Sequence, residues 1–215
     1  MFVRHTLNPL IRPDDLQPSR PDFEIIGTFN AGAIRHNDEV LLLLRVAERP
    51  VSQSSEVVLC PHLGVDGELV ITRIPRDDGR YDLSDSRMVR DRRTGDLLLT
   101  SISHLRLARS HDGVHFTVDA IPWLSAAIPE EGYGVEDARI TRIEDMYYIN
   151  YTAVSRYGIA TGLVTTQDFV QLKREGIIFP PANRDVAIFP QRIDGLYTCY
   201  HRPMPSILGT YNIWM

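Results

Sequence analysis

Two adjacent carboxylates, Glu136 and Asp137, together with the nearby Arg139, are the residues in this sequence that most directly suggest chemistry. They lie in the stretch YGVEDARI, which otherwise resembles the start of a β-strand, although strands are depleted in Asp and Glu. Hydrolysis of a glycosidic bond takes two carboxyl groups, one as acid and one as base or nucleophile. Phosphorolysis needs only the acid, because inorganic phosphate is then the nucleophile.

Arginine side chains suit phosphorolysis, because the planar guanidinium can bind a phosphate through two parallel hydrogen bonds. Four arginines could serve in this way: Arg45, Arg139, Arg184 and Arg202. The sequence has no P-loop, and Gly132 and Gly134 lack the third glycine and the βαβ setting of a dinucleotide-binding motif. An anion site in this protein would therefore be made of side chains.

The elements that must position these residues are short strands that repeat along the chain. Runs of β-forming residues each follow an acidic or glycine turn, and the turn aspartates are Asp38, Asp96, Asp145 and Asp194, separated by 58, 49 and 49 residues. A second unit, strand–turn–strand, occurs at 108–116 and again at 164–172, with starts 56 residues apart. A period near 50 residues is typical of β-propeller blades, whereas a β-sandwich has no reason to repeat one unit. We therefore expect an all-β protein, with 1–215 as a single propeller domain in which about four blades are present.

A polar residue precedes each turn at a similar distance. Asn30 and Asp137 lie eight residues before their turn aspartates, Asp185 lies nine before, and Asp85 lies eleven before. The innermost strands of a propeller line its central channel, so this register directs the polar residues into one cavity. Ion pairs between neighbouring blades are the alternative reading, but buried charges are costly unless they are used.

Composition excludes several classes of function. The chain has 215 residues and a net charge of −5, without the basic stripe of a nucleic-acid-binding protein. The N-terminus lacks a signal-peptide apolar run, and the longest apolar stretch, VLLLL, is too short to cross a membrane. Cys60 and Cys199 have no metal-ligand or redox spacing, and the histidine spacings favour turns over metal ligands. We expect a cytoplasmic protein with reduced thiols, no metal and no membrane or nucleic-acid partner.

The successive motifs FNAGA, LLLLRVAERP, YGVEDARIT, YYINYTA, NRDVAIFP and HRP closely resemble those of glycoside hydrolase family 130, the mannoside phosphorylases and related mannosidases. The resemblance runs from about Asn8 to the C-terminus. It implies a five-bladed β-propeller that is incomplete in this chain. The family members it resembles are longer, so we expect a C-terminally truncated propeller. Many members are oligomers, which makes a homo-oligomer possible here.

The resemblance also implies roles for individual residues. Asp137 matches the catalytic acid, which protonates the leaving oxygen directly or through a sugar hydroxyl. Asn30 and Arg45 match sugar-contacting positions, and Arg184 and Arg202 match phosphate-binding positions. Phosphate would attack the anomeric carbon with inversion, giving α-mannose 1-phosphate from a β-mannoside, with inorganic phosphate as co-substrate and no cofactor.

Further residues join the predicted site because of their position beside these. We assign Glu136, Asp185, Tyr133 and Arg87 to substrate binding, Tyr133 by stacking on a sugar ring, and His201 to phosphate binding. A core tyrosine is an equally good interpretation of Tyr133.

The sequence departs from the family pattern at Ala138, where proline is usual, and this predicts a looser loop around Asp137. Further phosphate-binding residues would lie beyond Met215, so we expect an incomplete site. Two other functions remain open: a hydrolase from a five-bladed propeller family, and an inactive carbohydrate-binding remnant.

Overall fold

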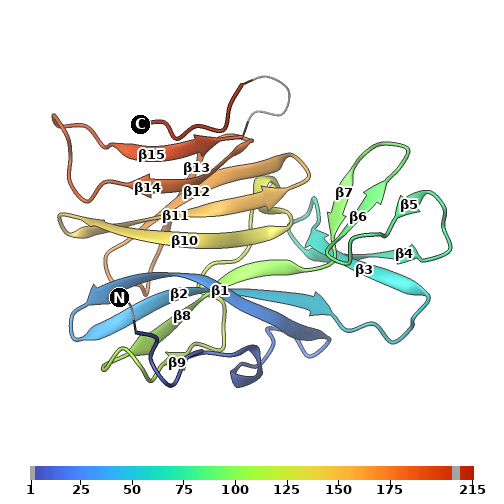
Figure 1. The fold of residues 1–215 in the computed structure, drawn as a ribbon, viewed down its shortest axis with the longest axis horizontal. Coiled ribbons are helices and arrows are strands. Elements are labelled where there is room, and N and C mark those ends of the chain that lie inside the picture. Colours follow the sequence, from blue (N-terminus) through green and yellow to red (C-terminus); the bar gives the residue numbers. More distant parts are fainter. Residues whose placement is uncertain (1–2, 205–208) are drawn as a thin grey trace.

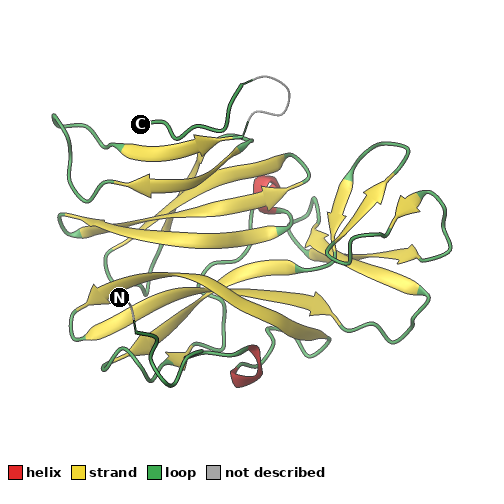
Figure 2. Ribbon diagram, viewed as in Figure 1, coloured by secondary structure: helices red, strands yellow, loops and turns green. Residues whose placement is uncertain are grey.

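Three antiparallel units in succession make up the main body of the protein, shown in a computed structural model that describes residues 3–204 and 209–215. The first unit is a four-stranded meander of β1 (Phe23–His36), β2 (Glu39–Pro50), β8 (Ile102–Ser110) and β9 (Thr117–Val118). The second is the meander of β10 (Gly134–Ile143), β11 (Met146–Ser155), β12 (Gly158–Thr166) and β13 (Lys173–Phe179). The third is the hairpin of β14 (Asn183–Ile188) and β15 (Cys199–Pro203). The all-β prediction is therefore confirmed (Figures 1 and 2).

An insertion of small sheets separates β2 from β8. It contains β3 (Val57–Leu63), β4 (Leu69–Pro75), β5 (Tyr81–Asp82), β6 (Met88–Asp91) and β7 (Leu97–Leu99). β3 pairs with β4, and β5, β6 and β7 form a separate three-stranded sheet. The insertion lies at the right of Figure 1, beyond the ends of the main strands. Two short 3-10 helices, η1 (Pro13–Asp15) and η2 (Pro129–Glu131), complete the elements.

The two predicted repeats have different outcomes. Asp38, Asp145 and Asp194 lie in the turns of the β1–β2, β10–β11 and β14–β15 hairpins, as expected. The assignment of the Asp96 unit to the same series is wrong, because it forms the β6–β7 hairpin of the insertion. A turn followed by a strand is a local pattern that any antiparallel pair can produce, so the period alone could not separate this hairpin from the others.

The second repeat is confirmed in detail. In the turn after β8, the carboxylate of Asp112 accepts hydrogen bonds from the amides of Val114 and His115, at 2.8 Å each. In the turn after β12, Asp168 accepts from two amides in the same way, at 2.8 and 3.0 Å. Each turn thus joins the third and fourth strands of a meander, and each aspartate supplies the local hydrogen bonds that close it.

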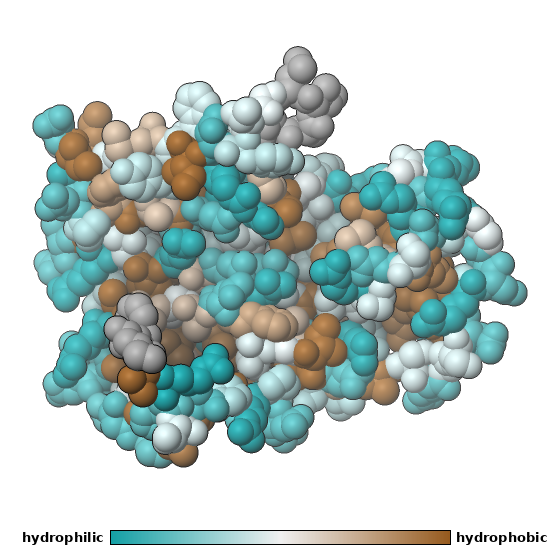
Figure 3. Space-filling view, in the orientation of Figure 1, coloured by the Kyte–Doolittle hydropathy of each residue, from teal (hydrophilic) through white to brown (hydrophobic). Residues whose placement is uncertain are grey.

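The core lies between the two meanders. Leucines of β2 and β8 pack against residues of β10, β11 and β12, and the largest cluster includes Leu41, Leu43, Leu105, Leu107, Val135, Ile149, Tyr151 and Val164. In the described part of the chain, one residue pair joins the meanders through the backbone ladder, Gly134 with Ser103, in parallel orientation. Side-chain packing, more than backbone pairing, therefore holds the meanders together. On the face shown in Figure 3, hydrophobic and hydrophilic side chains are mixed.

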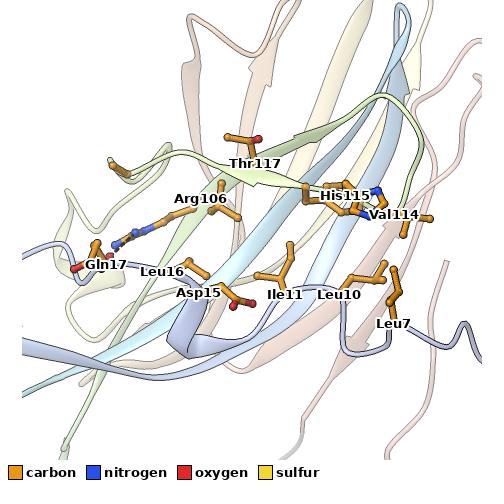
Figure 4. A pocket seen from close by; sticks show the side chains of 13 residues that line it. Leu7, Leu10, Ile11, Asp15, Leu16, Gln17, Arg106, Val114, His115 and Thr117 are labelled. Carbon is orange, nitrogen blue, oxygen red and sulfur yellow. Dashed lines mark hydrogen bonds between the residues drawn. The ribbon is translucent and has the colours of Figure 1, made fainter.

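A buried ion pair attaches the N-terminal segment to the first meander. Arg106 donates to Glu48 Oε1 at 2.9 Å, to the carbonyl of Gln17 at 2.8 Å and to Nε2 of His104 at 3.0 Å. Glu48 also accepts the backbone amide of Ser19 at 2.8 Å. Beside this network, apolar side chains of the segment and of β9 enclose a cavity of about 560 Å³ that contains none of the predicted site residues (Figure 4).

Two remaining expectations concern the thiols and the membrane. Cys60 and Cys199 are both free, as the sequence predicted, and Cys60 is buried. In the ranges 3–204 and 209–215, no helix has the length and apolar character needed to cross a membrane.

Candidate functional site

Three strands, β1, β10 and β14, each carry a β-bulge at the place where the sequence has its polar residue. The pairing register shifts between Phe29 and Gly32 in β1, between Glu136 and Arg139 in β10, and between Arg184 and Ala187 in β14. Bulges bend a strand and redirect its side chains, and they are common beside active sites.

The bulged residues are Asn30, Asp137 and Asp185, and all three have a positive φ, of 38°, 50° and 58°. Non-glycine residues rarely adopt this conformation, which tends to occur at functional sites. All three line one cavity of about 630 Å³, together with Arg139 and residues of the same three strands. The prediction that the repeated polar residues face a shared cavity is confirmed for these three. It is wrong for Asp85, which lies in the loop between β5 and β6.

Backbone contact between the first two bulges fixes their separation. A Cβ atom on Gly32 would lie 2.6 Å from the carbonyl oxygen of Ala138, so only glycine allows β1 to approach β10 this closely. Ala138 itself is buried. The residue that follows Asp137 is therefore packed against β1, even though it is not the proline usual at this position.

Arg45 connects the two carboxylates of the site. Its guanidinium donates to Glu136 Oε1 at 2.6 Å, to Asp137 Oδ1 at 3.1 Å and to the Ser103 hydroxyl at 3.2 Å. Asn30 donates to the same oxygen, Asp137 Oδ1, at 3.1 Å. Within the described ranges, Asp137 Oδ2 has no hydrogen-bond donor. Arg45 and Asn30 therefore hold one oxygen of Asp137 and leave the other available to a ligand.

Glu136 lies deeper than Asp137. Burial raises the pKa of the Glu136 carboxyl, and the negative charge of Asp137 acts in the same direction. Arg45, the Ser103 hydroxyl and the charge of Arg184 each oppose the rise in this pKa. Because the charge of Arg184 on β14 lowers the pKa of Glu136 on β10, these two side chains interact electrostatically.

A second charged group stands on β14 and β15. Arg202 donates to Asp185 Oδ2 through Nε at 2.8 Å and through a second nitrogen as well. Nε of Arg184 lies 3.7 Å from the same oxygen, beyond hydrogen-bond range, and within the described ranges this buried nitrogen has no hydrogen-bond partner. Two arginines thus converge on one carboxylate at the edge of the cavity.

Three predicted site residues lie elsewhere. Arg87 precedes β6 in the insertion, with its side chain 80% exposed and paired with Asp85 at 2.8 Å, so it does not reach the cavity. Tyr133 is buried, and its hydroxyl donates to the carbonyl of Leu97 at 2.5 Å. Its side chain therefore connects the start of β10 with the insertion.

His201 is the third of these. Its ring stacks on Phe179 with centroids 4.5 Å apart, and its Nδ1 lies 2.8 Å from the side-chain amide of Asn183. The ring is therefore engaged by neighbouring side chains, although it stands next to Arg202 in the sequence.

Two contributors escaped the sequence analysis. Ser103 accepts from Arg45 and donates to Glu136 Oε1 at 3.2 Å, and the Arg45 guanidinium lies 5.4 Å from the ring centroid of Phe29. Phe29 directly precedes the predicted Asn30, so its position was a usable signal. Ser103 stands in an ordinary strand sequence, and only the pairing of Gly134 with Ser103 brings it to the site. In the part of the chain that the structure describes, no group of three or more His, Cys, Asp or Glu residues could hold a metal ion.

The fold and the site together define an all-β protein in which bulges of three successive antiparallel units direct an amide and two carboxylates, with arginines, at one cavity. The profile of glycoside hydrolase family 130, described as beta-1,4-mannooligosaccharide phosphorylase, matches residues 87–215. The chain belongs to this family, and the resemblance seen in its motifs is confirmed.

Individual relatives agree with this assignment. A beta-1,2-mannobiose phosphorylase of Listeria innocua is 47% identical over 217 residues, which cover 100% of this chain and 61% of that protein. A solved structure of that enzyme with beta-1,2-mannobiose superposes with a TM-score of 0.92 over 98% of this chain and 61% of that one. A beta-1,2-mannobiose phosphorylase of Thermoanaerobacter is 32% identical over 130 residues, 59% of this chain and 43% of that protein. The chain thus spans less than two thirds of the length of these relatives.

Proposed function

We propose that this chain carries the reaction centre of an inverting β-mannoside phosphorylase, with inorganic phosphate as co-substrate and α-mannose 1-phosphate as product. The observation that carries the proposal is the convergence of Asn30, Asp137 and Asp185 on one cavity, with arginines on both sides. The identity of 47% to a beta-1,2-mannobiose phosphorylase supports a β-1,2 linkage in the substrate.

Asp137 is the proposed acid. Asn30 and Arg45 both donate to Oδ1, so the proton of the neutral acid would sit on Oδ2. When the bond between the anomeric carbon and the leaving oxygen breaks, this proton passes to that oxygen, directly or through a sugar hydroxyl. Arg45 and Asn30 hold the acid in place and can contact the sugar.

Phosphate would bind between Arg184 and Arg202. Both guanidinium groups already face an anion, the carboxylate of Asp185, and the Arg184 Nε atom has no hydrogen-bond acceptor within the described ranges. A phosphate oxygen could accept from Arg184, while Asp185 keeps Arg202 oriented. The phosphate would then attack the anomeric carbon from the face opposite the leaving oxygen, which gives inversion.

A second carboxylate free to act as base would favour hydrolysis. Here Glu136 is held by Arg45, and Asp185 is held by Arg202. Both carboxylates that accompany Asp137 in the proposed site thus neutralise arginines, which supports phosphate as the nucleophile.

For the whole fold, we propose a five-bladed β-propeller. The proposal takes the two meanders as two blades and the β14–β15 hairpin as the start of a third, each with its first strand at the shared cavity. This is fewer than the four blades expected from the sequence, because the Asp96 hairpin belongs to the insertion. The single domain, the cytoplasmic location and a homo-oligomeric state stay predictions from the sequence.

The decisive test is release of mannose 1-phosphate from β-1,2-mannobiose, with and without inorganic phosphate. We expect phosphate-dependent release that Asp137→Asn abolishes, whereas Asp145→Asn in an exposed turn leaves it intact. Arg184→Met and Arg202→Met should raise the KM for phosphate more than the KM for mannobiose. Phosphate-independent release of free mannose would instead establish a hydrolase, and binding of mannobiose without any release would establish a carbohydrate-binding protein.

A further inference from the structure

A further cavity, lined by both polar and apolar side chains, lies where the insertion meets the main body. It has a volume of about 420 Å³, and we call it the insertion pocket. The insertion contributes Arg80, Tyr81 and Asp91 to its lining, and the main body contributes Tyr133, Arg156 and Tyr157. None of these residues belongs to the cavity that contains Asp137.

The insertion pocket lies beyond the end of β10 that is nearer to Asp137. The insertion leaves β2 after Pro50 and enters β8 at Ile102, next to Ser103, which pairs with Gly134 at the start of β10. Asp137 is the fourth residue of β10, about 10 Å along an extended strand from Gly134. Figure 1 shows the insertion beyond this end of β10.

Two hydrogen bonds tie the insertion to the segment that leads into the carboxylates. The amide of Leu63 donates to the carbonyl of Gly132 at 2.8 Å, and the hydroxyl of Tyr133 donates to the carbonyl of Leu97 at 2.5 Å. One wall of the insertion pocket is therefore continuous with the strand that holds Glu136 and Asp137.

The lining has the chemistry of a sugar-binding site. Arg80 donates to Asp91 through Nε at 2.9 Å, and its guanidinium lies 5.1 Å from the ring centroid of Tyr81. The pocket lining therefore combines a charged pair with an apolar aromatic ring. From the main body, Tyr157, which is 60% exposed, and the exposed Arg156 line the same pocket. A pyranose has an apolar face that suits a tyrosine ring and hydroxyls that suit charged donors and acceptors.

We propose that the insertion pocket binds a distal sugar unit of a β-mannoside chain whose reacting end lies at Asp137. This inference rests on the proposed function. Because Tyr157 is exposed at the edge of the pocket, its ring can stack on the incoming sugar, and the Arg80–Asp91 pair can bond the hydroxyls. The protein then prefers mannosides longer than the disaccharide.

The test compares β-1,2-mannobiose with β-1,2-mannotetraose in two assays, calorimetric binding and phosphorolysis. We expect the wild type to bind mannotetraose more tightly than mannobiose. Tyr157→Ala should reduce that preference by about threefold to tenfold, the size expected for one aromatic contact. Tyr157→Phe keeps the ring and should keep the preference, and Tyr211→Ala, which removes another exposed tyrosine outside the pocket, serves as the matched control.

The outcomes separate this inference from the proposed function. Equal binding of the two sugars by the wild type would overturn the sugar-binding role of the pocket, as would an equal effect of Tyr157→Ala on both sugars. Tighter binding of mannotetraose that depends on Tyr157, in a protein that does not phosphorolyse either sugar, would support the pocket and refute the phosphorylase.

Discussion

Replacement of Arg45 by methionine is the perturbation for which the structure gives the clearest magnitude. Among the residues that the structure describes, Arg45 is the one guanidinium bonded to both Glu136 and Asp137, and its side chain is 21% exposed. Without it, two adjacent carboxylates stay partly buried with no direct cationic partner. Glu136, the more buried of the two, can relieve the repulsion by binding a proton.

The free energy needed to protonate Glu136 sets an upper limit on the loss of stability. To protonate a carboxyl of ordinary pKa 4.5 at pH 7 costs about 3.4 kcal/mol, and burial has already raised the pKa of Glu136, which lowers this cost. We therefore expect Arg45→Met to reduce the free energy of unfolding by about 2 to 3 kcal/mol at pH 7. A carboxyl with a raised folded-state pKa loses stability as the pH rises through that pKa. The loss should thus shrink below about 1 kcal/mol at pH 5.

Urea unfolding of the wild type and Arg45→Met at pH 7 and pH 5 measures both quantities. The same substitution in a Glu136→Gln background should cost less, because the repulsion is then absent. Arg49→Met is the matched control: Arg49 lies on the same strand, is exposed and pairs with exposed Glu24, so its removal should cost less than about 1 kcal/mol. A loss for Arg45→Met that is equal at both pH values, or unchanged by Glu136→Gln, would refute this reasoning.

Three further predictions concern the backbone, the buried histidine and the thiols. Gly134→Ala should lower the free energy of unfolding by more than about 2 kcal/mol and reduce turnover. The new Cβ would lie 2.4 Å from a backbone oxygen of β8, and the φ of residue 134 is +113°, which disfavours any side chain. A stability equal to that of the wild type, measured by thermal unfolding, would contradict this. Burial lowers the pKa of His104 to about 3 from 6.5, so its contribution to stability is complete above pH 6.5 and is lost as the pH falls towards 3. Between pH 7 and pH 5, His104→Gln should therefore lose about 2 kcal/mol less than the wild type in urea titrations, and parallel titrations would argue against a buried neutral imidazole. In thiol labelling of the native protein at pH 8, Cys199 should react before Cys60, because Cys60 is buried and its pKa is raised to about 11; earlier reaction of Cys60 would contradict its burial.

The sequence was sufficient for the all-β class, for most of the repeat and for three polar residues that line one cavity. Hairpin turns leave a local signature, since glycine, asparagine and aspartate favour the turn conformations, and this placed Asp38, Asp145 and Asp194 correctly. Asn30 and Asp137 lie at the same distance before their turns because each bulge occupies the same place in its strand. This constant spacing was therefore a sequence signal of the bulges.

Only the tertiary structure decided which of these local units meet. The Asp96 hairpin has the same turn signature as the others but belongs to the insertion, so Arg87 is exposed away from the cavity. Ser103 reaches Glu136 because Gly134 allows β10 to lie against β8. Local sequence specifies turns and strands through short-range backbone preferences. The approach of β8 to β10 depends on packing between residues far apart in the chain, so a local sequence pattern cannot predict it.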